Sequence, residues 1–357
     1  MDDCHSVSPT RISALDEQYS ICPSFPEYPS GSKRHLALPM KSDSTDTSPN
    51  FIGIGAQKAG TTWLYSQLSK HPSVWMPPIK ELHYFDRSPK YSSPNGLNAV
   101  SPFTRIWRND PFYQRQRRRI VQSLPKYIVS KNFDMIRWCA RWIFGYYDDR
   151  WYKSLFEDKP PGTISGEITP AYSILTRQDI EWMNRINPLL KIILFVRNPI
   201  ERAWSALRFY KKIGRFKNDI NCPNAVLATL AKEEYTNRGD YMNTIENYLS
   251  VFDSSRFLIC FYDSIEEKPE ELLEKIYSFL EIPSIMSDRE QLSTRHNASP
   301  PHQMHQEVRA YLIDTNISSI EIMAQRYGGY FDAWHQNLLG ESPISPKSTT
   351  FPAAINP

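Results

Sequence analysis

A short apolar run followed directly by a helical pattern occurs three times in this chain, and this repetition constrains the fold more than any other feature. The paired ranges are 51–55 with 62–70, 191–196 with 199–212, and 256–262 with 269–280. Strand-then-helix repetition is typical of βα units, in which helices cover a mainly parallel sheet. Pro199 and Pro269 each stand where a first-turn proline is expected in a helix. We therefore predict an α/β fold with a mainly parallel central sheet flanked by helices.

Composition along the chain indicates one folded domain with two tails. Residues 1–49 and 339–357 are rich in Ser and Pro and poor in aliphatic residues, so we predict that both are disordered. The folded domain is predicted to span residues 50–338, a length that single α/β domains reach. Inside it, residues 88–149 lack a strand pattern, and apolar positions recur at helical spacing. We interpret this segment as a helical insertion that covers the acceptor side.

Charge and cysteine content narrow the functional class. Lys and Arg number 42 and Asp and Glu number 39, and the net charge of +3 argues against a globally basic nucleic-acid binder. The five cysteines include no CxxC pair, which favours reduced thiols over disulfides or a zinc site. No signal-peptide core is visible, and no apolar stretch reaches the ~18 residues of a membrane-spanning helix. We expect a cytoplasmic enzyme without a transmembrane segment, and its oligomeric state stays open.

The first predicted strand runs into a glycine-bounded turn, residues 55–62, that opens a helix. Backbone N–H groups and the positive helix end would face an anion there, and Lys58 would add its charge. The candidate binding residues are Gln57, Lys58, Ala59, Gly60, Thr61, Thr62 and Trp63. In the triphosphatase loop GxxxxGK[ST] the lysine follows the second glycine, whereas here it precedes the second glycine, so no magnesium-binding site is obvious. The alternative is a tight loop whose glycines only permit close packing.

A second candidate anion-binding element follows the strand at 191–196. This strand delivers Arg197 at its carboxyl end, the edge where open α/β sheets bind ligands. Ser205 lies about two helical turns further on, within reach of that edge. An arginine fork with a hydroxyl suits a terminal phosphate, so the two elements together favour a nucleotide with two separated phosphates. The alternative is that Arg197 only pairs with a surface carboxylate such as Glu201.

The lysine, glycine and paired threonines of the turn resemble those of the nucleotide-dependent sulfotransferases, and most closely the branch that includes the heparan sulfate sulfotransferases and many bacterial relatives. The resemblance continues through residues 80–86, 166–172, 191–210, 237–280 and 295–311. It implies a P-loop-like sulfotransferase fold. It also implies the donor 3′-phosphoadenosine 5′-phosphosulfate (PAPS), with 3′-phosphoadenosine 5′-phosphate (PAP) as product and no metal.

The resemblance also implies roles for individual residues. Arg197 and Ser205 match the element that binds the 3′-phosphate of the donor. Arg295 and Asn297 match the loop that closes over the nucleotide. The family often carries a lysine near the position of Ile168, and its absence leaves the lysine of the turn as the main cation for the leaving group.

The candidate general base lies in the motif at 80–86. If this segment is extended, Glu81 and His83 share one face. A sulfuryl acceptor loses a proton as it attacks sulfur, so a positioned Glu or His is required. The resemblance assigns this catalytic role to Glu81, with His83 as orienting partner or substitute base and Lys58 as the cation that neutralises the leaving oxygen. The alternative is that Glu81 is solvated and His83 is a core residue.

Two other functional classes stay open. A P-loop kinase or triphosphatase is the nearest, because the strand at 256–262 ends at Asp263, which could hold magnesium, although GK[ST] is missing. A non-enzymatic anion or nucleic-acid binder is suggested by the basic stretch 115–119, but such charge runs are usually solvated helix faces, so we predict no nucleic-acid partner. Aromatic residues in the insertion and near Trp151 favour a small-molecule or saccharide acceptor.

Overall fold

A six-stranded sheet forms the centre of the computed structural model, which describes residues 47–91, 101–107, 111–285, 292, 302–340 and 350–352. In spatial order the strands are β2 (Val74–Trp75), β3 (Ile164–Ile168), β1 (Phe51–Gly55), β4 (Lys191–Val196), β5 (Phe257–Phe261) and β6 (Thr350–Pro352). Neighbouring strands are parallel except for β5 and β6, which are antiparallel. The predicted α/β fold with a mainly parallel sheet is confirmed.

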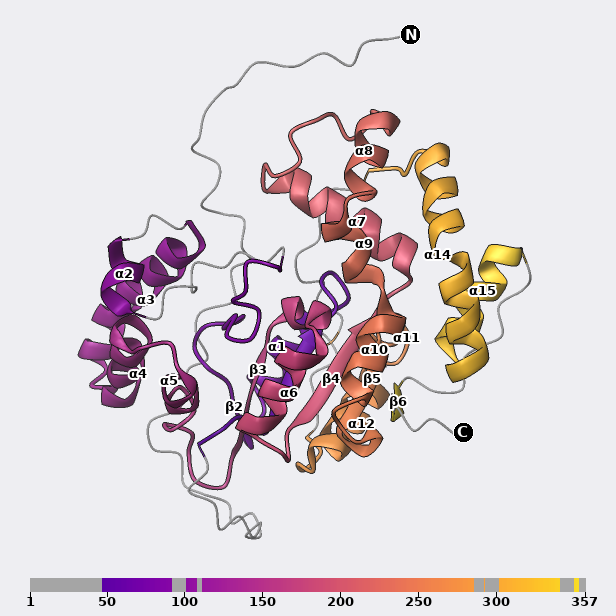
Figure 1. The fold of residues 1–357 in the computed structure, drawn as a ribbon. Coiled ribbons are helices and arrows are strands. Elements are labelled where there is room, and N and C mark those ends of the chain that lie inside the picture. Colours follow the sequence, from indigo (N-terminus) through magenta and orange to yellow (C-terminus); the bar gives the residue numbers. More distant parts are fainter. Residues whose placement is uncertain are drawn as a thin grey trace.

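Helices flank this sheet (Figure 1). In chain order they are α1 (Thr61–Leu68), η2 (Pro170–Ile174), α6 (Arg177–Ile186), α7 (Pro199–Lys212), α8 (Pro223–Leu230), α9 (Glu233–Thr236), η3 (Asn237–Gly239), α10 (Tyr241–Leu249), η4 (Ser254–Arg256), α11 (Tyr262–Glu267), α12 (Pro269–Leu280), α14 (Gln306–Tyr327) and α15 (Tyr330–Leu339). Every residue of β1, β3 and β5 is buried, as a parallel sheet covered on both faces requires. The carboxyl ends of β1, β3 and β4 therefore meet at one edge of the sheet.

The three predicted strand–helix pairs are all present: β1 leads to α1, β4 to α7, and β5 to α11 and α12. Sequence reasoning missed β2 and β3. β2 has only two residues, and β3 reads ISGEI, in which Gly166 and Glu167 interrupt the apolar run that marks a buried strand. The neighbouring strands, and not the local pattern, therefore define β3.

The limits of the folded part differ from the predicted 50–338. The side chain of Ser48 is buried, and its hydroxyl donates to the backbone oxygen of Ile186 at 3.2 Å. At the other end, α15 reaches Leu339 and β6 pairs with β5, so residues 350–352 of the predicted disordered tail belong to the sheet. Residues 1–46 lie outside the described residues, and their disorder stays a prediction.

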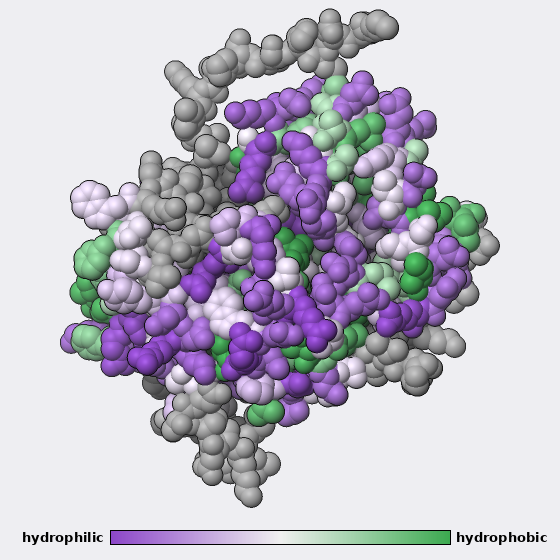
Figure 2. Space-filling view, in the orientation of Figure 1, coloured by the Kyte–Doolittle hydropathy of each residue, from purple (hydrophilic) through white to green (hydrophobic). Residues whose placement is uncertain are grey.

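The predicted insertion at 88–149 is helical where the structure describes it. It contains α2 (Pro102–Trp107), α3 (Pro111–Val129) and α4 (Phe133–Phe144), and α5 (Asp149–Ser154) leads back to the sheet. These helices lie together on one side of the sheet, far from α14 and α15 (Figure 1). Most of the large hydrophobic side chains that are exposed in the described part of the chain lie here, at an edge that is partly green in Figure 2. They are Phe103, Trp107, Val121, Ile128, Val129, Phe133, Phe144 and Tyr146.

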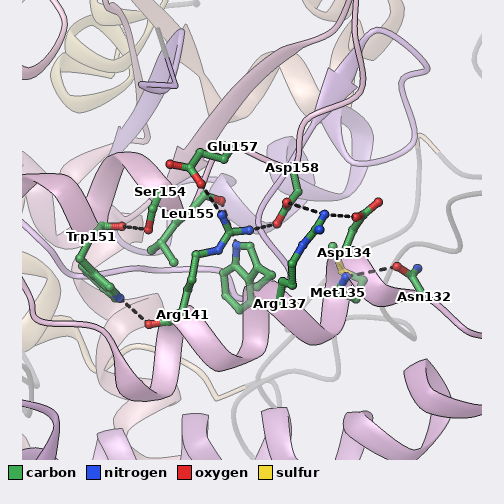
Figure 3. Close-up of polar contacts among 11 residues, drawn as sticks. Asn132, Asp134, Met135, Arg137, Arg141, Trp151, Ser154, Leu155, Glu157 and Asp158 are labelled. Carbon is green, nitrogen blue, oxygen red and sulfur yellow. Dashed lines mark hydrogen bonds and ion pairs between the residues drawn. The ribbon is translucent and has the colours of Figure 1, made fainter. Parts of the chain in front are cut away.

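Ion pairs fasten α4 to the segment that precedes β3 (Figure 3). Arg141 contacts the carboxylates of both Glu157 and Asp158, and Arg137 Nη2 lies 3.8 Å from Asp158 Oδ1. The indole of Trp138 donates to the backbone oxygen of Leu155 at 2.9 Å. The side chains of Arg141 and Asp158 are 23% and 7% exposed, so the pair that they form is shielded from solvent more than an ordinary surface pair. The insertion is therefore docked on the segment that feeds into the sheet.

Two features bear on the predicted compartment. Within the described ranges, no helix combines the length and the apolar character needed to cross a membrane. Cys139, Cys222 and Cys260 are buried and none of them forms a disulfide bond in the described part of the chain, and burial raises the pKa of Cys139 to about 11, which keeps that thiol protonated. The cytoplasmic location stays a prediction.

Gly55 closes β1 with a φ of 142°, a conformation that residues with a side chain rarely adopt. An added Cβ would lie 2.9 Å from the backbone oxygen of Pro170 and 3.0 Å from Ser173 Cβ. We expect Gly55→Ala to lower the free energy of unfolding by about 2–4 kcal/mol, because backbone strain and a clash add together. Urea denaturation measures this change. Gly162→Ala is the matched control, since Gly162 has a φ of 78° but open space around its Cβ.

In the control variant Gly162→Ala the free energy of unfolding should fall by only about 1 kcal/mol, the cost of the left-handed backbone alone. Equal losses in the two variants would mean that close packing beside η2 does not require glycine at residue 55.

Candidate active site

The turn after β1 presents the start of α1 without the usual capping groups. Gly60 is the N-cap residue with a φ of 105°, and it offers no side chain to the helix. The first turn of α1, which begins at Thr61, also contains no acidic residue. The first N–H groups of a helix have no partner within that helix. Together with the positive helix end, they form a site that favours an anion.

A group of cationic side chains surrounds this turn. Its members are Lys58, Lys80, Arg197, Arg208 and Lys212, and we call them the cation cluster. The pKa of Lys58 is lowered to about 8, first by burial and then by repulsion from the other four members. Gathering like charges costs free energy, which a bound polyanion would recover. The cluster therefore favours a ligand with several negative charges.

Arg197 leaves the carboxyl end of β4 and reaches the turn. Its Nη1 donates to the backbone oxygen of Lys58 at 3.5 Å, and its Cζ lies 4.2 Å from the ring centroid of Tyr262. Among the described residues, the buried Nε of Arg197 has no hydrogen-bond partner, and the same holds for Nε of Arg208. A buried N–H group without a partner is costly, so both guanidinium groups have donors to offer to a ligand anion.

The helix α7 places Ser205, Arg208 and Lys212 on one face, because they are three and four residues apart. Sequence reasoning selected Ser205 and missed the two cations, which a search for basic residues on the same helix face would have found. Glu201 is 3.7 Å from Arg309 Nη1 and not paired with Arg197, in contrast to the surface pairing considered from the sequence.

The carboxylate of Glu81 lies between two cationic groups. Its Oε1 is 3.0 Å from Lys80 Nζ, and its Oε2 is 3.6 Å from His83 Nε2. The other ring nitrogen of His83 is 2.7 Å from Asp86 Oδ2. Lys80 Nζ also donates to Thr62 Oγ1 at 3.3 Å, which connects this carboxylate to the turn. Because the Glu81 side chain is still 30% exposed, a substrate can reach it.

The charges of this group fix its protonation near neutral pH. Burial would raise the pKa of Glu81, but Lys80 and His83 lower it to about 2. Burial would lower the pKa of His83, but Asp86 and Glu81 raise it to about 10. Glu81 is therefore ionised and His83 is protonated at pH 7.

Residues 80–86 do not adopt the extended conformation that was the condition for Glu81 and His83 to share one face. Glu81 has a φ of 67° and His83 a φ of 55°, both in the left-handed region, and the segment forms no strand. Alternation of side chains requires continuous extended backbone, which these two residues break. Their side chains nevertheless meet, because the two left-handed residues curl the backbone around them.

Arg295 and Asn297 lie outside the described residues. The nearest described residues on either side are Leu292 and His302, and tryptophans of α1 and α7 bind their backbone oxygens. Trp63 Nε1 donates to the backbone oxygen of Leu292 at 3.0 Å, and Trp204 Nε1 donates to that of His302 at 3.0 Å.

Asp263, the candidate magnesium ligand of the kinase alternative, follows β5. Its Oδ1 accepts a hydrogen bond from Trp334 Nε1 at 3.2 Å, and burial raises its pKa. In the part of the chain that the structure describes, no group of three or more His, Cys, Asp or Glu side chains could hold a metal ion.

Comparison with known proteins shows similarity to sulfotransferases. Residues 183–338 match the family model of the sulfotransferase domain, so the resemblance to sulfotransferases is confirmed. The human carbohydrate sulfotransferase 15 is 24% identical over 278 residues, which cover 70% of this chain and 47% of that protein. The membrane-associated sulfotransferase kil1 of Dictyostelium discoideum is 23% identical over 322 residues, covering 74% of this chain and 62% of that protein.

A third relative is the bifunctional heparan sulfate N-deacetylase/N-sulfotransferase of Drosophila melanogaster, 22% identical over 71% of this chain and 21% of that protein. The chain thus spans about half the length of carbohydrate sulfotransferase 15, and less of the bifunctional enzyme. Among solved structures, a sulfotransferase from Alicyclobacillus acidocaldarius aligns with 82% of this chain and 96% of its own, with 20% identity and a TM-score of 0.49.

Proposed function

We propose that this chain transfers the sulfuryl group of PAPS to a hydroxyl or amine of a carbohydrate or small-molecule acceptor. The observation that carries the proposal is the cation cluster at the uncapped start of α1, directly beside an ionised and partly exposed glutamate. The cation cluster suits a polyanionic donor, and the neighbouring glutamate suits an acceptor that must lose a proton.

The donor occupies the edge of the sheet at β1 and β4. The 5′-phosphosulfate lies against the N–H groups of the turn and Lys58, and the 3′-phosphate lies against Arg197 and Ser205. The two buried Nε–H groups at Arg197 and Arg208 support this placement, because a phosphate supplies the acceptors that they lack among the described residues. Lys80 links Thr62 of the donor turn to Glu81, so donor and base lie side by side.

Glu81, and not His83, is the general base of this proposal. His83 holds a proton near neutral pH, whereas Glu81 is ionised and has an accessible carboxylate. The low pKa makes Glu81 a weak base, so it takes the proton late, when bond formation to sulfur has already acidified the acceptor. His83, fixed by Asp86, orients the Glu81 carboxylate.

The transfer itself is an in-line displacement at sulfur. The acceptor oxygen or nitrogen forms a bond to sulfur, and the bond from sulfur to the bridging oxygen of the 5′-phosphate breaks. The electron pair of that bond stays on the phosphate oxygen of PAP, where Lys58 and the N–H groups of the turn neutralise it. The acceptor proton passes to Glu81.

A saccharide acceptor is supported by similarity to two relatives, a carbohydrate sulfotransferase and a heparan sulfate N-deacetylase/N-sulfotransferase. Residues 80–87, which carry Glu81 and which we call the base loop, also touch the end of the insertion. Arg87 Nη1 donates to the backbone oxygen of Tyr147 at 2.6 Å, and Tyr84 OH donates to Asp149 Oδ1 at 2.6 Å. The insertion thus borders the acceptor side of Glu81, and its aromatic side chains suit the faces of sugar rings.

Calorimetric titration with PAP, with and without magnesium, tests the donor site. We expect metal-independent binding that Arg197→Ala weakens at least about tenfold (about 1.4 kcal/mol). Arg309→Ala is the control, because Arg309 is exposed and pairs with Glu201. Absence of PAP binding, or binding only of ATP with magnesium, would contradict the proposal and favour phosphoryl transfer.

The affinity for PAP should fall as pH rises through about 8. The pKa of Lys58 is lowered to about 8 in the free protein, and only the protonated lysine attracts the phosphate. Between about pH 7, above the second pKa of a phosphate group, and this pH the affinity is therefore nearly constant, and it weakens above it, with the uptake of up to one proton per PAP bound. Calorimetry in a series of buffers measures both effects. Lys58→Arg, which remains charged, should bind PAP with little pH dependence up to about pH 10; a fall near pH 8 in this variant would assign the titration to another group.

A further inference from the structure

Glu167 in β3 is a buried carboxylate that the proposed mechanism does not use. It is 1% exposed, and three hydroxyl groups donate to it. Tyr152 OH lies 2.5 Å and Tyr172 OH 3.2 Å from Oε1, and Thr169 Oγ1 lies 2.8 Å from Oε2. None of these three donors is cationic. A buried carboxylate costs free energy unless its charge is compensated, so its presence here calls for an explanation.

Two of the three donors support the loop that carries the proposed base. The backbone N–H of Tyr84 donates to Tyr172 OH at 2.8 Å, so Tyr172 must give its own proton to Glu167. The ring of Tyr152 stacks on that of Tyr84, with centroids 4.5 Å apart and an interplanar angle of 11°. Tyr84 directly follows His83, whose left-handed backbone is unfavourable for a residue with a side chain and persists only when its surroundings hold it.

We propose that Glu167 is a positioning residue that, through Tyr172 and Tyr152, holds Glu81 and His83 in the geometry required to deprotonate the acceptor. This inference rests on the proposed function of that loop. An ionised carboxylate accepts hydrogen bonds from all three hydroxyls at once. A protonated carboxyl group turns one oxygen into a donor and leaves a hydroxyl partner without an acceptor. All three hydrogen bonds to Glu167 are therefore formed only when its carboxylate is ionised.

The inference predicts a pH dependence of its own. Burial raises the pKa of Glu167 to about 7, although its three hydroxyl donors and His83 act to lower it. The titratable groups that interact with Glu167 are Tyr152 of α5, Tyr172 of η2, Tyr248 of α10 and His83 of the base loop. Tyr84 and Asp86 of the same loop interact with Tyr152 and Tyr172 in turn. The pKa values of the four tyrosines are all raised, and that of His83 is about 10. Turnover therefore falls as pH drops through about 7, because Glu167 takes up a proton.

The test compares wild type with Glu167→Gln and Tyr172→Phe. Turnover is measured as PAP released from PAPS with water as acceptor, between about pH 5.5 and 8.5, and PAP affinity is measured by calorimetry. At pH 8 we expect Glu167→Gln to lower turnover about tenfold, with PAP affinity unchanged. In this variant turnover should no longer fall as pH drops through about 7, a fall that we call the acid limb of the pH profile. Tyr172→Phe removes one donor to the carboxylate, so the acid limb should move to higher pH. Tyr277→Phe, a buried tyrosine of α12, is the control and should leave turnover and its pH profile unchanged.

Imidazole NMR signals of His83, assigned by comparison with His83→Asn, report the loop without any activity. We expect a step near pH 7 in wild type that disappears in Glu167→Gln and shifts in Tyr172→Phe. A wild-type acid limb that persists unchanged in both variants, together with unaltered His83 signals, would overturn the inference. If wild type neither binds PAP nor releases it from PAPS, the proposed function fails instead, and the NMR step still decides the role of Glu167.

Discussion

Replacing Lys58 with alanine should lower PAPS turnover by about 10²–10³-fold, because the change removes the lysine of the turn that neutralises the leaving phosphate oxygen. The loss should appear in both donor binding and the rate at saturating PAPS. Lys58 is partly buried beside four other cations, so solvent screens its charge less than that of a surface lysine. Release of PAP from PAPS measures the rate, and calorimetry measures the affinity for PAP.

Lys212→Ala is the matched control for this prediction. Lys212 belongs to the same cation cluster but is exposed, so its removal should change turnover by less than about threefold at physiological salt. A loss in Lys58→Ala no larger than in Lys212→Ala would show that the cluster acts only through its total charge and that the turn holds no reacting group.

Replacing Glu81 with glutamine should lower the rate of transfer by about 10²–10⁴-fold while PAP binds as tightly as before or more tightly. The rate falls because the acceptor proton has no base. The affinity is preserved because the substitution removes a negative charge that pairs with Lys80, and Lys80 then has its full charge for the donor. This opposite response of rate and affinity separates a base from a residue that only supports the turn.

Two further variants sharpen the assignment of the base. His83→Asn keeps a residue type that tolerates the left-handed backbone, and it should reduce the rate by only about tenfold if His83 orients Glu81. Glu234→Gln, at an exposed position of α9, should leave the rate unchanged. A rate in His83→Asn as low as in Glu81→Gln would contradict the assignment and make His83 the base.

Local pattern was sufficient to predict the three strand–helix pairs, because each combines an apolar run with a helix signal such as Pro199. It failed for β3, whose ISGEI sequence contains Gly166 and Glu167. The glycine is needed because an added Cβ would lie 2.4 Å from the ring of Phe51 in β1, and the glutamate is tolerated because three hydroxyls surround it. Both reasons depend on residues that are distant in the sequence, and the hydrophobic periodicity of a local segment carries no information about them.

The residues of the candidate site, too, could be predicted from the sequence only in part. Residues of the turn, Arg197 and Glu81 could be selected because each stands in a short motif with a recognisable role. Arg208 and Lys212 could not, because their part in the site depends on how α7 packs beside the turn. The backbone of Glu81 could not be predicted from the alternation of side chains, because the loop is held by tertiary contacts of Tyr84.

The crowding of like charges around α1 also links the ionic strength of the solution to the stability of the fold. Repulsion within the cation cluster destabilises the ligand-free protein. Moderate salt screens this repulsion and should therefore raise the melting temperature of the ligand-free protein. The same screening weakens the attraction for a polyanion, so salt should reduce the extra stability that a bound ligand confers, which is about 2.7 kcal/mol at a ligand concentration of 100 Kd. Salt thus acts with opposite sign on the empty and the filled protein, and thermal melting alone distinguishes ligands that occupy the cluster from those that bind elsewhere.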